Sequence, residues 1–252
     1  MIKFELIKKE IKEYLKTPKG LILLVLFLFF AFSSPLLAKY IKEILASVAT
    51  DVEIIFPEPT LKDSWMQYFK NMNSICIIVY LIVMTGTISQ EKNKGSIILV
   101  LTKKVSRFSL IFSKFLVGSL VFTVLFLLST LVNGWYTNIL FDEFNYNGLI
   151  ISLLLQWLMG IFFTALAIFT SVIGKTPTTS ALLGFFAFAI LQIFNISSEL
   201  ALYNPSGASA IVNSILANTV DNSKLWIPII SSILFTVFLL AGSQIIFKRQ
   251  EL

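Results

Sequence analysis

Six long runs of apolar residues constrain the fold of this chain more than any other feature of its sequence. They cover about residues 21–38, 72–89, 108–135, 149–173, 179–198 and 225–247. A helix needs about 20 mostly apolar residues to cross the hydrocarbon core of a bilayer. Because the runs are continuous and do not alternate with polar residues, a membrane β-barrel is disfavoured. The sequence therefore predicts an all-α integral membrane protein, with six transmembrane helices in one domain over residues 1–252.

The composition narrows the chemistry that the chain can perform. It contains no histidine and one cysteine, Cys76, so disulfides within the chain, Cys- and His-based metal sites and Ser–His–Asp triads are excluded. The phosphate-binding sequence G-x-x-x-x-G-K-[ST] does not occur either. We therefore predict no catalytic residue, no metal and no cofactor in this chain.

The middles of the apolar runs lack ionisable residues. Such residues at membrane depth are the usual carriers in ion-coupled transport. The polar residues in these runs include four amides, which more often bind helices together: Asn133, Gln156, Gln192 and Asn195. A chain of this kind either conducts passively or takes its work from a partner protein.

Residues 1–16 have the pattern of an amphipathic helix. Lysines fill much of one face, and apolar residues recur on the other at steps of three and four: Phe4, Ile7, Ile11, Tyr14 and Leu15. The pattern predicts an interfacial helix on the membrane surface, with its lysines toward anionic headgroups. The alternative is a solvated helix at the edge of the protein.

The distribution of basic residues predicts the orientation. Six spans place both termini on one side, and 15 of the 20 Lys and Arg residues fall on that side. Cytoplasmic loops carry such an excess, so the termini and the loop between runs two and three are expected in the cytosol. The chain is then a multi-pass protein of the cell membrane. Its net charge of +6 is explained by this orientation, and no nucleic-acid partner is needed.

Two connections have recognisable features. Residues 39–71 are predicted to be a polar connection, and its aromatic residues Trp65, Tyr68 and Phe69 suit a belt at headgroup level. Residues 208–220 are too short and too polar to span, so we expect a re-entrant or surface helix there.

The basic loop, residues 90–107, joins runs two and three. Its centre predicts a short helix over residues 96–105, with a cap at Ser96 after Gly95 and with Lys103 and Lys104 suited to its C-terminal end. Four apolar residues fall on one side of that helix: Ile97, Ile98, Leu101 and Val105. We interpret it as a docking helix for a partner protein. The alternative is a loop that is simply flanked by cytosolic charge.

The same residues resemble a known signature. Residues 91–96, 99–102 and 105–107 (EKNKGS, LVLT and VSR) are similar to the segment between spans two and three of type-2 ABC exporter permeases. The layout is similar too, with an N-terminal amphipathic helix, six spans and a broken segment before the last span. Two positions depart from the family pattern, because Lys104 replaces a proline and Ile98 replaces an acidic residue.

The resemblance implies a transport subunit that pairs with a second permease copy or paralogue and with two ATP-binding subunits, which hold ATP and Mg. It implies that the coupling residues lie in the basic loop: Glu91, Gly95, Ser96, Ile97, Ile98, Leu101, Lys103, Lys104, Val105 and Arg107. Short loops are similar to those of small members that export antibiotics or peptides such as phenol-soluble modulins. The rival interpretations are a passive channel or membrane-scaffold subunit and, third, an enzyme acting within lipid, for which we find no catalytic constellation.

Overall fold

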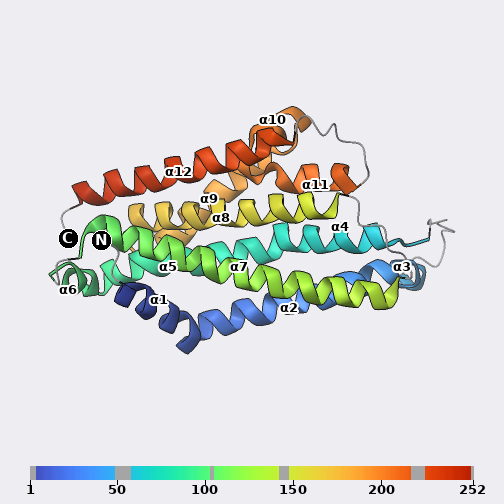
Figure 1. The fold of residues 1–252 in the computed structure, drawn as a ribbon, viewed down its shortest axis with the longest axis horizontal. Helices are drawn as coiled ribbons and strands as arrows, with labels where there is room; N and C mark the ends of the chain where they lie inside the picture. Colours follow the sequence, from blue (N-terminus) through green and yellow to red (C-terminus); the bar gives the residue numbers. More distant parts are fainter. Residues whose placement is uncertain (1–3, 49–57, 103–104, 142–147, 217–224, 251–252) are drawn as a thin grey trace.

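The computed structural model describes residues 4–48, 58–102, 105–141, 148–216 and 225–250. Within these ranges every regular element is helical, and long helices run side by side as an elongated bundle (Figure 1). Six helices in the described part are long and apolar enough to cross a membrane. Their bounds are α2 Pro18–Lys39, the continuous helix Leu61–Asn93, α7 Arg107–Leu140, α8 Leu149–Ile173, α9 Pro177–Phe194 and α12 Trp226–Arg249. The predicted fold class is confirmed.

The second span is longer than the sequence suggested. It consists of α4 Leu61–Asn71, a π-helical segment η1 Met72–Cys76 and α5 Ile77–Asn93. Trp65, Tyr68 and Phe69 are buried inside the protein, and the Tyr68 hydroxyl lies 2.8 Å from Ser129 Oγ on α7. The prediction of an aromatic belt in a polar connection is therefore wrong for this segment.

The physical reason is that α4 is amphipathic. Its polar residues made the segment read as a loop, but Leu61, Trp65 and Tyr68 recur at steps of four and three and so share one face. That face packs against α2 and α7, while the charged residues Lys62, Asp63 and Lys70 are partly or fully exposed.

Helix α8 is the centre of the bundle, since it contacts α5, α7, α9, α12 and α11. Close packing depends on small residues: a side chain at Gly160 would overlap the Phe122 ring of α7. The Tyr80 hydroxyl of α5 donates to Gly118 O at 3.0 Å and lies 2.7 Å from Thr164 Oγ1, which joins α5, α7 and α8.

The two ends of the bundle differ. One end carries α1 Phe4–Lys16 and α6 Ser96–Thr102 (Figure 1). The other carries the short elements α3 Ile41–Val48, α10 Ser198–Tyr203, η2 Pro205–Gly207 and α11 Ala208–Leu216. The expected helix over residues 208–220 is present as α11, which packs on α8 and α4; residues 217–220 lie outside the described part.

Candidate coupling site at the base of the bundle

Helix α6 lies at one end of the bundle, between the end of α5 and the start of α7 (Figure 1). The turn into it is made by Gly95, whose φ of 67° is in the left-handed region that favours glycine. The Ser96 hydroxyl donates to Glu91 O at 3.3 Å, and Gly95 N donates to Lys92 O at 3.0 Å. The predicted helix is therefore present over Ser96–Thr102, while Lys103 and Lys104 lie outside the described residues.

The apolar residues of α6 do not share one face, so that prediction is wrong for the pair Ile97 and Ile98. Ile97 is 1% exposed and Ile98 is 46% exposed. Adjacent residues on a helix point about 100° apart, so a short helix that packs one side against a bundle can bury Ile97 and leave Ile98 exposed. The side chain of Leu101 lies outside the described residues. Helix α6 is thus held by Ile97 and presents Ile98 outward.

Ile97 belongs to a small hydrophobic cluster at this end, which we call the basal cluster. Its buried members come from α5, α6, α7, α8 and α12, and Val105 packs against it; they are Ile88, Ile97, Leu110, Ile111, Ile168, Val172 and Phe247. Helix α6 therefore packs against four spanning helices, α5, α7, α8 and α12.

Arg107, at the first residue of α7, binds the end of α12. Its Nη1 donates to Phe247 O at 2.5 Å, Lys248 O at 2.9 Å and Gln250 O at 2.9 Å. The last carbonyls of a helix have no partner within it and carry partial negative charge, so a guanidinium suits them. Lys92 does the same for α8, donating from Nζ to Val172 O at 2.6 Å.

Replacing Arg107 with glutamine is expected to lower the free energy of unfolding by about 2 kcal/mol, because carbonyls accepting from a charged group lose their partner. The matched control is Arg249→Gln, at the end of α12 that Arg107 binds. Arg249 is exposed, so this substitution should change the free energy of unfolding by less than about 0.5 kcal/mol. The measurement is unfolding in mixed micelles with rising dodecyl sulfate. Equal stability of the two variants would contradict this assignment.

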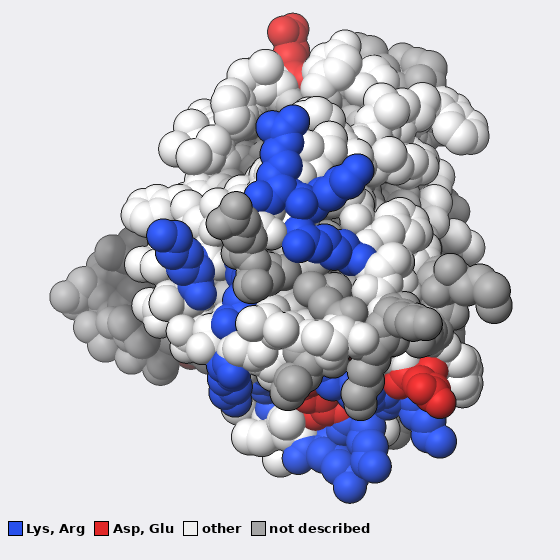
Figure 2. Space-filling model, turned by 90° about the vertical axis from the view of Figure 1, so that its left-hand side faces the viewer, with Lys and Arg blue, Asp and Glu red and all other residues white. Residues whose placement is uncertain are grey.

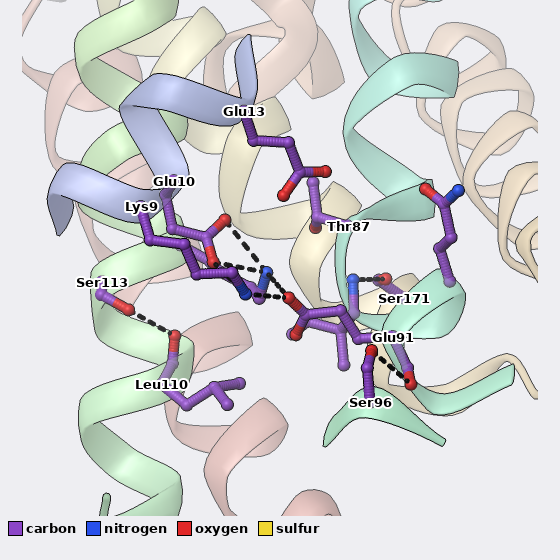
Figure 3. Close-up of polar contacts among 12 residues, drawn as sticks. Lys9, Glu10, Glu13, Thr87, Glu91, Ser96, Leu110, Ser113 and Ser171 are labelled. Atoms are coloured by element: carbon purple, nitrogen blue, oxygen red, sulfur yellow. Dashed lines mark hydrogen bonds and ion pairs between the residues drawn. The ribbon is translucent and has the colours of Figure 1, made fainter. Parts of the chain in front are cut away.

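A group of charges, buried except for Lys9, joins α1 to the bundle. We call it the basal ion cluster, and its members are Lys9, Glu10, Glu91 and Lys114 (Figure 3). Lys114 Nζ of α7 lies 2.9 and 3.0 Å from the two Glu10 oxygens of α1 and 3.3 Å from Glu91 Oε1 of α5. Lys9 Nζ donates to the same Glu91 oxygen at 2.7 Å. The Lys114 side chain is 2% exposed and that of Lys9 47%.

Two acids and two bases make this cluster neutral overall. Taking an ion out of water costs several kcal/mol unless opposite charges and hydrogen bonds replace its solvation. Lys114 receives both from Glu10 and Glu91. Three carboxylates, those of Glu10, Glu13 and Glu91, approach within 4.8 Å of one another. Because ammonium groups supply the countercharge, we interpret the arrangement as an ion-pair network.

The sequence did not reveal Lys9, Glu10 and Lys114 as site residues. A signal existed: Lys114 is the one charged residue within the apolar run 108–135, and Glu10 lies four residues after Leu6 and four before Tyr14. Those spacings place an acid on the buried face of α1. Glu91, predicted to act in ATPase coupling, has its Oε1 held by Lys9 and Lys114.

The apolar stripe predicted for residues 1–16 is divided. Ile7, Ile11 and Tyr14 pack on the bundle, while Phe4 is 78% exposed. The Tyr14 hydroxyl donates to Met84 Sδ of α5 at 3.0 Å, and burial raises the pKa of Tyr14 well above its ordinary value. Helix α1, described from Phe4 onward, is therefore docked on the protein along one face and leaves its lysines Lys8, Lys12 and Lys16 exposed.

The end that carries α1 and α6 is rich in basic side chains. Viewed from this end, Figure 2 shows many Lys and Arg side chains and few Asp or Glu side chains on the described surface. The excess agrees in sign with the cytosolic orientation expected from the sequence.

Comparison with known proteins extends these observations. The sequence model of the protein family described as ABC-2 family transporter protein matches residues 4–252. An uncharacterized transmembrane protein of Bacillus subtilis (strain 168), YxlG, is 23% identical over 182 residues, which is 71% of this chain and 70% of that protein.

Proposed function

The chain belongs to the ABC-2 transporter family and is the membrane permease of an ABC transporter, and we propose that it exports a hydrophobic or amphipathic molecule from the cell. The family implies an ATP-binding partner. In our proposal two ATP-binding subunits serve a pair of permeases, the second being another copy or a paralogue. The cargo is a peptide, toxin or antibiotic.

The observation that carries the mechanism is the double attachment at the base. Helix α6 is packed through Ile97 onto α5, α7, α8 and α12. Helix α1 is tied to α5 and α7 through the basal ion cluster. Packed interiors transmit displacement because they have few voids. A closing pair of ATP-binding subunits that pushes on α6 and α1 would therefore move four spanning helices together.

Membrane vesicles test the function. Inverted vesicles that contain the permease and its ATP-binding subunit are expected to accumulate amphipathic cargo only when ATP is present. Vesicles with the permease alone should accumulate none. Ion conductance by the purified permease alone in a planar bilayer would support the rival passive channel and contradict the proposal.

Thiol labelling tests the orientation. In a Cys76→Ser background, a cysteine at the exposed position Glu199 should react with a membrane-impermeant maleimide added to intact cells. A cysteine at the exposed position Lys94 should react only after the cells are opened. The expectation follows from the excess of basic residues at the α6 end. The reverse labelling pattern would contradict it.

A further inference from the structure

Two adjoining cavities lie at the end of the bundle away from α6. One, of about 330 Å³, is bounded by α4, η1, α5, α9 and α11. The other, of about 420 Å³, lies mainly between α2, α3 and α4. Lys70 of α4 and Asn213 of α11 line both. Both cavities border α4, and the function proposed above assigns them no role.

The amides of the smaller cavity offer hydrogen-bond donors. Asn73 Oδ1 accepts from Gln156 Nε2 at 2.8 Å, and Gln192 Oε1 accepts from Asn195 Nδ2 at 3.1 Å. Each oxygen is thus bonded inside the protein, and each amide nitrogen, Asn73 Nδ2 and Gln192 Nε2, is left to donate. Gln156 is fully buried, so Asn73 is bonded to the interior of the bundle.

The charge at the smaller cavity, like its amide donors, suits a negatively charged ligand. Among the described residues that line the smaller cavity, Lys70 carries a charge, and its side chain is exposed. Asp63, which lines the larger cavity, already accepts from Thr60 N and Thr60 Oγ1 at 2.8 Å each in the capping box of α4. One ammonium and two amide donors are the groups that recognise a small anion such as a phosphate or carboxylate.

The depth of Lys70 suits a lipid-like headgroup. Lys92, at the base of the same continuous helix, belongs to the basic loop, and Lys70 lies 22 positions away. At 1.5 Å per residue this is about 33 Å, close to the hydrocarbon thickness of a bilayer. Lys70 therefore lies at the opposite headgroup level.

An apolar stripe leads from the cavity toward the base. Ile78 lines the cavity, and Ile75 and Ile82 on the same helix are exposed. On α5 the spacing of four places Ile78 and Ile82 on one face, and Ile75 precedes them in η1. The polar lining residues Asn73 and Ser74 belong to η1, and π-helical turns occur frequently at functional sites. An amphiphile with its charged head at Lys70 and its acyl chain along the isoleucines would contact both the polar lining and the apolar residues.

We propose that the smaller cavity binds the anionic headgroup of an amphiphile through Lys70, Asn73 and Gln192, with its acyl chain along Ile75, Ile78 and Ile82. The site takes a negatively charged, lipid-like molecule. This deepens the proposed transport function by giving the chemical class of the cargo, and it rests on that function for the cargo role alone.

Binding is tested on the full-length permease purified in a neutral detergent. The probes are dodecyl phosphate, dodecyltrimethylammonium of matched chain length, and inorganic phosphate without a chain. We expect dodecyl phosphate to bind at least about tenfold more tightly than either other probe, since charge-assisted hydrogen bonds and the chain both contribute. Equal binding of the cationic probe would overturn the proposal. Equal binding of inorganic phosphate would reduce the site to a small-anion site and also overturn it.

Variants locate the binding. Lys70→Gln should weaken binding of dodecyl phosphate about tenfold, and Lys70→Arg should restore most of it. Asn73→Asp keeps the acceptor for Gln156 but adds a negative charge, so it should abolish binding. The control Lys62→Gln lies on α4 outside both cavity linings and should leave the affinity unchanged. Unchanged affinity in both Lys70→Gln and Asn73→Asp would overturn the assignment.

The same preparations separate this proposal from the general function. With the ATP-binding subunit added, dodecyl phosphate should stimulate ATP hydrolysis by the wild-type complex and not by the Lys70→Gln complex, while both permeases retain the subunit. Binding without stimulation in a complex that hydrolyses ATP would overturn the cargo class. A wild-type permease that retains no ATP-binding subunit would instead overturn the transport proposal, and the binding result would stand.

Discussion

Replacing Lys114 with methionine is expected to lower the free energy of unfolding by about 3–5 kcal/mol and to abolish ATP-driven transport. The substitution keeps the length of the side chain but removes the positive charge that faces Glu10 and Glu91. Two carboxylates would then remain buried with the exposed Lys9 as their nearest base. Breaking a buried ion pair by removing one partner typically costs this much, because the remaining charge has no compensation. Unfolding in dodecyl sulfate measures the stability, and vesicle uptake measures transport.

The same cluster supplies the controls. Lys9→Met removes the exposed base of the cluster and should cost about 1 kcal/mol or less, as exposed ion pairs do. The triple variant Lys114→Met, Glu10→Gln and Glu91→Gln leaves no unpaired charge among these three residues and should recover much of the lost stability. A Lys114→Met protein as stable as Lys9→Met would show that the basal ion cluster does not hold α1 to the bundle.

Replacing Ile98 with lysine is expected to lower retention of the ATP-binding subunit at least tenfold while the permease stays folded. Ile98 is exposed on α6, whereas the neighbouring Ile97 supplies the packing that holds the helix. An apolar residue at the centre of an interface commonly contributes 2 kcal/mol or more, which is a factor of about 30 in affinity. Pull-down of the tagged subunit from detergent extracts measures the effect.

Three further variants serve as controls for the substitution of Ile98. Ile98→Leu should retain the subunit, because it keeps an apolar surface of similar volume. Lys175→Asp changes the charge of an exposed residue in the turn between α8 and α9 and should have a small effect on retention. Ile97→Asp should instead unfold the base, since it buries a charge in the basal cluster. Full retention by Ile98→Lys would contradict the docking role proposed for α6.

The number and order of the spanning helices could be predicted from the sequence, because the thickness of the bilayer core sets how many consecutive apolar residues a spanning helix needs. The helix at Ser96 could be predicted as well, since Gly95 and the apolar residues after it give a local signal. Local signals do not say which face a neighbour covers. For that reason Ile97 and Ile98 were placed together, and the structure separates them.

The basal ion cluster shows the limit most clearly. Its members are far apart in sequence, with 82 positions between Lys9 and Glu91 and 104 between Glu10 and Lys114. Charge counting assigned all of them to one side of the membrane but could not pair them. The first third of the second span, α4, could not be predicted for a related reason, since its polar residues masked the signal of its buried aromatic residues.

The π-helical segment within the second span has a consequence for the geometry of the whole helix. A π turn contains more residues than an α turn, so η1 changes the rotational phase between α4 and α5. One residue of phase is about 100° around the axis. With that offset, Tyr68 above the segment reaches α7, while Tyr80 below it reaches both α7 and α8. The π-helical segment thus sets the angle between the side chains of α4 and those of α5, and one continuous helix contacts two different sets of neighbours.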